Sequence, residues 1–169
     1  ITTVGRINNS NEILKNVISE KAHFFEMHNG EINATELVAA IINQKDNFIE
    51  GIKYAQEISD GSISMLILTP KGVYAARDKL GRTPVAIGKK EDGYCACFEC
   101  FSYLNLGYYD YKELGPGELV VMEPDGVKTL SAPGKDLKIC AFLWIYYGYP
   151  CSSYEGKSVE EVRNRCGEL

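Results

Sequence analysis

The feature of this sequence that most restricts its fold is a change in hydrophobic period near Ser62. Before it, apolar residues recur at helical spacing; after it, short apolar runs are separated by turns such as "TPKG", "EDG" and "PDG". We predict strands in the runs "SISMLIL", "VYAA", "PVAIG", "YCACF" and "ELVVME". Connections this short cannot hold the crossover helices of a parallel sheet, so an antiparallel meander is expected. Helices followed by strands indicate an α+β fold in which helices cover sheets in layers.

Two helices are predicted ahead of the strands, over Asn33–Asn43 and Asp46–Ile58. Asn33 can cap the first helix, and Glu36 follows three residues later as in a capping box. Gly51 lies inside the second helix and is expected to weaken it by about 1 kcal/mol relative to alanine. That helix carries an apolar stripe at helical spacing, formed by Phe48, Ile49, Ile52, Ala55 and Ile58.

The last thirty residues differ from the rest. The aromatic run "ICAFLWIYYGYP" is predicted to be a strand that ends at Pro150. A new helix follows, capped by Ser158 with Glu161 three residues later. Val159 and Val162 give this helix an apolar side that we expect to dock on something downstream. The expected organisation is therefore one domain over residues 1–138 and an exit strand and linker helix over residues 139–169.

Composition excludes several classes of function. The 169 residues carry 18 basic and 23 acidic side chains, a net charge of −5, which argues against nucleic acid as a partner. With 45% hydrophobic residues the chain can bury a core without disulfides. No apolar run reaches the roughly 18 residues of a membrane span, and no secretory signal pattern opens the chain. We therefore expect a cytoplasmic protein whose six cysteines are reduced.

The motif "HNGEI", from His28 to Ile32, has two interpretations. In the first, Asn29 and Gly30 form an ordinary hairpin turn without a catalytic role, because Asn-Gly strongly favours such turns. Alternatively, the Asn29 side-chain NH₂ and the Gly30 backbone N–H form an oxyanion hole, in which glycine allows close approach of the backbone. His28 and His23 have no serine or cysteine at suggestive spacing, so neither is expected to act as a general base.

Two further clusters have mainly structural interpretations. Cys95, Cys97 and Cys100 lack the paired spacing of a zinc site and are expected to be core thiols that bind no metal. The Arg77–Asp78 pair before a glycine-bearing turn could be a surface salt bridge worth under about 1 kcal/mol.

Several of these segments together resemble one family. The stretches "GVYAARDKLGRTPVAIGKKEDGY", "LGPGELVVMEPDGV", "HNGEINATEL" and "KICAFLWIYYGYPCSSYEGKSVEEVRNRCGE" are similar to the glutaminase domain of the amidophosphoribosyltransferases and to the segment that leaves it. "ITTVGRINNSN" is more weakly similar to the family's R-Y-S-T-x-G loop. The resemblance is continuous from about Ser62 onward and patchy before it.

The resemblance implies a fold and a reaction. The fold is the N-terminal nucleophile (Ntn) hydrolase αββα sandwich of two antiparallel sheets between helical layers, in which Arg77 and Asp78 are structural. The reaction releases ammonia from glutamine for synthesis of 5-phosphoribosylamine from phosphoribosyl pyrophosphate, the first step of purine biosynthesis. Asn29 and Gly30 would form the oxyanion hole, and Thr3 and His28 would bind the substrate.

The sequence also departs from the family. The family's nucleophile is an N-terminal cysteine, but Ile1 stands at position 1 and an arginine that binds the substrate carboxylate would precede it. The T-D-S-E segment expected after the Asn33 helix is missing. The polypeptide as printed is therefore expected to be inert, either because segments of the protein are absent from it or because it is a degenerate paralogue.

The resemblance also implies cofactors and partners. No cofactor is expected within this domain, and magnesium would accompany phosphoribosyl pyrophosphate in the full enzyme. Cys140 matches a cysteine that helps to hold an iron–sulfur cluster in some members, but members without a cluster carry cysteine there too, so the resemblance leaves the cluster open. The expected partners are glutamine, the protein's own phosphoribosyltransferase domain and further copies of the chain, with no nucleic acid and no membrane. Two alternatives stay open: another class II glutamine amidotransferase, or a catalytically dead binding or regulatory module.

Overall fold

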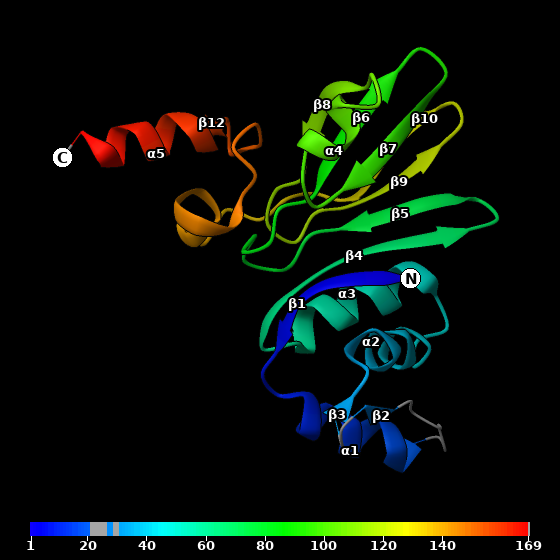
Figure 1. Cartoon of the computed structure of the whole chain (residues 1–169). Coiled ribbons are helices and arrows are strands. Elements are labelled where there is room, and N and C mark those ends of the chain that lie inside the picture. The colour runs from blue at the N-terminus through cyan, green and yellow to red at the C-terminus, as the bar shows by residue number, and fades with distance from the viewer. Residues whose placement is uncertain (21–26, 29–30, 169) are drawn as a thin grey trace.

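The computed structural model describes residues 1–20, 27–28 and 31–168, and its main feature is a pair of antiparallel sheets (Figure 1). The larger sheet has the order β1-β4-β5-β9-β10, with bounds Thr2–Ile7, Gly61–Thr69, Gly72–Ala76, Leu119–Glu123 and Gly126–Ser131. The smaller sheet has the order β7-β6-β8, with bounds Gly93–Cys97, Ala86–Lys90 and Tyr109–Glu113. Every pairing is antiparallel, as predicted. The chain leaves the larger sheet after β5 and returns at β9, so the expected meander is divided between two sheets.

A helical layer covers one face of the larger sheet (Figure 1). It consists of α1 (Ser10–Glu20), α2 (Ala34–Ile42) and α3 (Phe48–Ile58). Helices α2 and α3 match the predicted ranges, and asparagines cap both. Burial of each large aliphatic side chain in this layer stabilises the fold by about 1.5–3 kcal/mol. The buried residues from the two layers include Leu37, Val38, Ile41, Ile52, Ala55, Ile63, Met65, Ile67 and Leu119.

Small residues on β5 allow the layers to pack closely on both of its faces. Successive side chains on a strand point to opposite faces. Accordingly, Ala76 packs in the helical layer, whereas Ala75 packs between the two sheets. Both are almost completely buried. The interface between the sheets also contains Val85, Ile87, Leu114, Val120 and Met122. These layers form the α+β sandwich that the sequence predicted.

The outer face of the smaller sheet is covered by the four-residue helix α4 (Phe101–Leu104). Cys95 and Cys97 project from β7 and pack with Cys100 and Tyr103 against Ala86. Free thiols are among the most buried side chains in proteins, so their place in this small core is a normal one. Among the described residues, no three histidine, cysteine, aspartate or glutamate side chains are placed so that they could hold a metal ion.

The Arg77–Asp78 pair is buried and structural, so the alternative of a surface salt bridge is wrong. Arg77 donates to the carbonyl oxygens of Gly81, at 2.7 Å, and Leu114. Asp78 accepts three backbone N–H bonds, from Leu80 at 3.2 Å, Arg82 at 3.0 Å and Thr83 at 2.8 Å. The two side chains thus hold the segment of residues 77–83, here called the Arg77 turn, by separate sets of hydrogen bonds.

The predicted strand in the aromatic run is wrong. Residues Leu143–Tyr147 form η1, a turn of π-helix, closed by a bond of 2.7 Å from the Gly148 N–H to the Leu143 carbonyl. The rings of Phe142 and Tyr146 stack at 5.0 Å, four residues apart, as a helix allows and a strand does not. Aromatic residues favour strands only when a neighbouring strand receives them. Here only Trp144 of η1 is buried, and it packs on Tyr154 instead.

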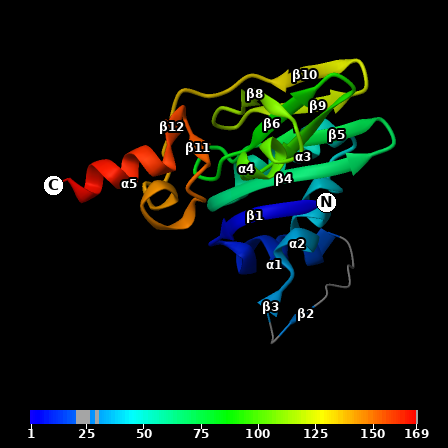
Figure 2. The ribbon, with the colours of Figure 1, turned by 45° about the horizontal axis from the view of Figure 1, so that its top comes forward.

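The chain then forms the short hairpin β11–β12 (Ser153–Tyr154 and Lys157–Ser158) and α5 (Val159–Gly167). As predicted, Ser158 caps α5, accepting the Glu161 N–H at 3.4 Å. The apolar side of α5, which was expected to dock on something downstream, already packs within this chain, because Val159 is buried against Trp144 and Tyr154. We call residues 139–168 the C-terminal unit. Figure 2 shows that α5 extends away from the sheets.

In the part of the chain that the structure describes, no helix has the length and apolar character needed to cross a membrane.

Candidate functional site

The candidate site lies where β1 and the first turn of α2 meet, and we call this region the N-terminal corner. Thr3 lies on β1, the edge strand of the larger sheet, opposite Met65 on β4. Its hydroxyl is 2.7 Å from the hydroxyl of Thr35 in the first turn of α2. The predicted substrate-binding side chain is therefore half-buried and fixed to the helix by a hydrogen bond.

The "HNG" motif begins at His28, the last residue in the first strand of a small hairpin that leads into α2. Strand β2 (Met27–His28) pairs antiparallel with β3 (Glu31–Ile32), so His28 lies opposite Glu31. Asn29 and Gly30, which connect these strands in the sequence, lie outside the described residues, as does the side chain of His28. Their roles as oxyanion donors and substrate ligand stay predictions.

The N-terminus of α2 adds favourable electrostatics to the corner. Asn33 accepts the backbone N–H groups of Thr35 at 2.9 Å and Glu36 at 3.3 Å. The aligned peptide dipoles of a helix place partial positive charge at this end, which stabilises nearby anions. Asn33 is the single residue between β3 and α2, so the hairpin directly adjoins the positive end of the helix.

A cavity of about 810 Å³ opens beside the corner. Its polar lining comes from Arg6 at the end of β1 and from Asn8, Ser10 and Asn11 at the start of α1. Ile32 and Ala34 line its other side, beside the hairpin. Sequence reasoning did not identify these polar residues, although the polar run "NNSN" directly after β1 was the available signal. The cavity combines one cation with several hydrogen-bonding groups and is large enough for an amino acid.

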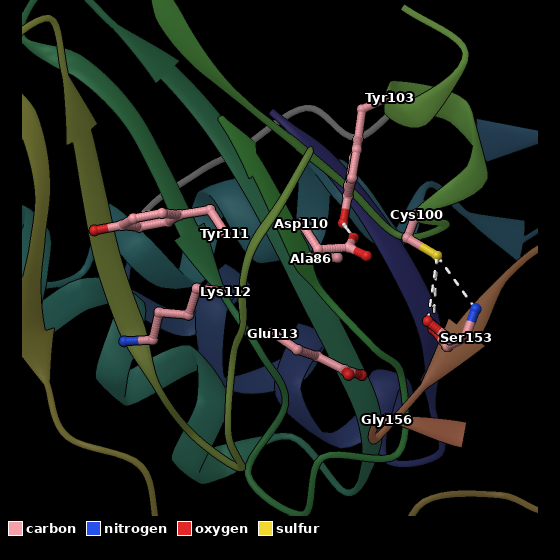
Figure 3. Close-up of a pocket in the computed structure, with 9 residues that line it drawn as sticks. All are labelled: Ala86, Cys100, Tyr103, Asp110, Tyr111, Lys112, Glu113, Ser153 and Gly156. Carbon is pink, nitrogen blue, oxygen red and sulfur yellow. Dashed lines mark hydrogen bonds between the residues drawn. The ribbon is translucent and has the colours of Figure 1, made fainter. Parts of the chain in front are cut away.

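A second, smaller cavity of about 220 Å³ lies between β8, α4 and the β11–β12 hairpin (Figure 3). Tyr103 donates to Asp110 at 2.5 Å, and the Ser153 N–H donates to the Cys100 sulfur at 3.2 Å. Glu113 faces the same space, and burial, followed by the charge of Glu155, raises the pKa of its carboxyl to about 7. Thr3, the described member of the predicted active-site residues, does not line this cavity.

The cysteines do not lie at the N-terminal corner. Burial raises the pKa of the Cys95 and Cys97 thiols, which makes them poor nucleophiles. Cys140 is exposed in the C-terminal unit and lines a cavity of about 360 Å³ beside Phe142 and Tyr147. Nothing in the described residues supplies Cys140 with the further ligands that an iron–sulfur cluster needs.

No family model matches the chain. Curated relatives do match over most of it. An amidophosphoribosyltransferase of Arabidopsis thaliana is 30% identical over 173 residues, which cover 99% of this chain and 30% of the relative. The Archaeoglobus fulgidus amidophosphoribosyltransferase is 24% identical over 157 residues, 92% of this chain and 34% of the relative. The human enzyme is 28% identical over 141 residues, 72% of this chain and 27% of the relative.

The chain is a relative of the amidophosphoribosyltransferases. It spans about a third of the length of the curated relatives it matches. A solved structure of the glutamine phosphoribosylpyrophosphate amidotransferase of B. subtilis, complexed with ADP and GMP, superposes with a TM-score of 0.88. The match covers 99% of this chain and 36% of that one at 23% identity, so it shows the fold. The chain therefore has the same layered α+β sandwich fold as that amidotransferase.

Proposed function

We propose that this chain is the glutaminase part of an amidophosphoribosyltransferase. The observation that carries the proposal is the likeness of nearly the whole chain to such enzymes, in sequence and in fold. In the full protein, glutamine is hydrolysed to glutamate and ammonia. The ammonia then displaces pyrophosphate from phosphoribosyl pyrophosphate and gives 5-phosphoribosylamine, the first step of purine biosynthesis. The same comparisons favour this enzyme over other class II glutamine amidotransferases, because the relatives carry this name.

The N-terminal corner supplies groups for the first half-reaction. Asn29 and Gly30 stabilise the negative oxygen that forms when a thiolate attacks the side-chain amide of glutamine. The positive end of α2 lies directly after their hairpin and favours the same charge. Thr3 and His28 bind the substrate, and the guanidinium of Arg6 in the adjacent cavity offers a partner for its carboxylate.

The thiolate must come from a cysteine other than the six printed here. Cys95, Cys97 and Cys100 belong to the outer layer of the smaller sheet, and Cys140, Cys151 and Cys166 belong to the C-terminal unit. We therefore infer an N-terminal cysteine outside these 169 residues as the nucleophile. Attack gives a thioester and releases ammonia, and water then hydrolyses the thioester to glutamate.

The proposed organisation assigns residues 1–138 to the glutaminase domain and residues 139–169 to the exit toward a phosphoribosyltransferase domain. The separate small core of Trp144, Tyr154 and Val159 supports this division. We place the protein in the cytoplasm, with glutamine, its own transferase domain and further copies of itself as partners, and with neither nucleic acid nor membrane. Magnesium enters with phosphoribosyl pyrophosphate at the transferase domain, and the glutaminase domain needs no cofactor.

Asn29→Ala in the full-length protein tests the assignment. We expect ammonia release from glutamine to fall by roughly 10²–10³, because one oxyanion donor is lost, while glutamine binding changes less. Asn105→Ala, the same change at an exposed position after α4, serves as the matched control and should keep full activity. A fall of less than about threefold would remove Asn29 from the oxyanion hole. If the unaltered full-length protein releases no ammonia, the chain is instead a dead binding or regulatory module.

A further inference from the structure

The tip of the β11–β12 hairpin has an unusual residue for its conformation. Glu155 and Gly156 form the two-residue connection, with φ of +50° and +70°. Such connections favour Asn-Gly, because side chains larger than asparagine are strained in the left-handed region. Glu155 is the one non-glycine residue with positive φ in the described part of the chain. A strained glutamate at this position suggests that its carboxylate is what the fold requires.

The carboxylate of Glu155 reaches into the sandwich and pairs with Arg77. Its Oε1 is 2.8 Å from Arg77 Nη1, and the Arg77 side chain is 0% exposed. The other bonds of this guanidinium go to uncharged carbonyl oxygens of Gly81 and Leu114. The hairpin tip therefore supplies the negative charge that a completely buried cation needs.

Glu113 connects this ion pair to the cavity in Figure 3. Its Oε2 accepts the Glu155 N–H at 2.8 Å, while its Oε1 is buried and has no partner among the described residues. The charged and titratable groups around it are Arg77 at the end of β5, Glu155 on the hairpin, Asp110 on its own strand, and Tyr103 and Cys100 of the α4 region. Glu113 is therefore acted on by the positive charge of Arg77 and by the negative charges of Glu155 and Asp110.

We propose that the β11–β12 hairpin is a proton-sensitive latch between the C-terminal unit and the sandwich. While Glu113 is protonated and uncharged, the Glu155 carboxylate pairs with Arg77 without competition, which is the closed state of the hairpin tip. When Glu113 ionises, its charge competes for Arg77 and repels Glu155 and Asp110, so the tip loosens. The base of the hairpin stays attached, because Glu99 accepts the hydroxyl groups of Ser152 at 2.7 Å and Tyr154 at 2.6 Å.

The direction of the pH effect follows from the shift at Glu113. Its pKa is raised from 4.5 to about 7 in the closed state. A raised pKa stabilises the closed state at low pH, and this stabilisation is lost as the pH rises toward 7. If the pKa of Glu113 is about 7 in the closed state and 4.5 in the open state, the equilibrium constant for opening of the hairpin tip increases up to about tenfold between pH 6 and pH 8.

Hydrogen exchange measured by mass spectrometry on the full-length protein tests the latch. The relevant peptides cover residues 150–158, and their rates are corrected for the intrinsic pH dependence with an unfolded reference. We expect protection to fall by up to about tenfold from pH 6 to pH 8 in the unaltered protein. Glu113→Gln should remove this fall, and Glu155→Gln should lower protection at both pH values because Arg77 loses its counter-charge.

Glu160→Gln on the exposed face of α5 is the matched control, since it changes one carboxylate of the same unit that does not face Glu113. It should keep the pH dependence of the unaltered protein. Equal protection at the two pH values in the unaltered protein would overturn the proposal, and so would an undiminished fall in Glu113→Gln. If Glu113→Gln does not fold, unchanged protection in Glu155→Gln overturns it instead.

Discussion

The N-terminal corner and the Arg77 turn are built in opposite ways. At the corner, the hydroxyl groups of Thr3 and Thr35 join β1 to α2 beside a cavity of about 810 Å³. At the Arg77 turn, two buried charged side chains make five hydrogen bonds to backbone groups between them. The corner leaves room for a substrate and the turn leaves none. Charged residues in a motif are therefore better judged by what they contact than by their charge.

Asp78→Ala should have the largest effect on stability and should leave the corner unchanged. Three backbone N–H groups lose their acceptor, and each unsatisfied buried group costs about 1–3 kcal/mol. We expect the free energy of unfolding to fall by about 3–5 kcal/mol in urea titrations, with glutamine hydrolysis per folded molecule retained. Asp92→Ala is the control, because that aspartate is exposed and pairs with Lys90 at 3.6 Å, so its loss should cost under about 1 kcal/mol. Equal effects from the two substitutions would mean that the buried turn is no more important than a surface one.

The same comparison shows which features of the structure could be predicted from the sequence, namely those that depend on neighbouring residues. The start of α2 could be predicted from Asn33 because a helix cap acts within three residues, and in the structure Asn33 accepts the N–H groups of Thr35 and Glu36. The partner of Arg77 could not be found in this way, because Glu155 lies 78 positions along the chain and no local pattern connects them. The division of the strands into two sheets is equally non-local.

The strand prediction for the aromatic run "ICAFLWIYYGYP" was wrong for a related reason. Its strand propensity was a valid local signal, but strand propensity depends on a neighbouring strand. In the structure, Trp144 packs against Tyr154 and Val159 instead. The helical turn also places its Nε1 so that it donates to the Lys157 carbonyl at 3.0 Å. Of the candidate site, the sequence identified the hairpin motif and Thr3, but the polar lining from Arg6 to Asn11 depends on how α1 folds back beside β1.

Gly51→Ala should have an intermediate effect on stability. It also tests whether the packing of α2 against α3 affects the N-terminal corner. From sequence, alanine should strengthen α3 by about 1 kcal/mol. In the structure, a Cβ at Gly51 would come within 2.4 Å of the Ile42 carbonyl oxygen, so α2 and α3 must move apart. We expect a net loss of about 1–3 kcal/mol on thermal or urea unfolding, because overpacking outweighs helix propensity.

Gly167→Ala is the matched control for this change. Gly167 ends α5, and a Cβ there meets nothing within 4 Å. Alanine should therefore be neutral or slightly stabilising at this position. If both substitutions stabilise the protein, the close approach of α2 and α3 is unimportant. Because α2 also carries Asn33 and Thr35, Gly51→Ala should raise the KM for glutamine, whereas Asp78→Ala should not.

Thr3→Val should have the smallest effect on stability and gives the most direct information about the corner. Valine keeps the shape of threonine but removes the hydroxyl that bonds Thr35, a loss of about 0.5–1.5 kcal/mol. If Thr3 also touches the carboxylate of glutamine, the KM rises while kcat changes little, because that contact is made equally in the ground and transition states. Thr35→Val breaks the same hydroxyl pair from the helix side and is the control. Comparable increases in KM for the two variants, with no further increase in the double variant, would mean that Thr3 only positions α2; an increase confined to Thr3→Val would make it a substrate ligand.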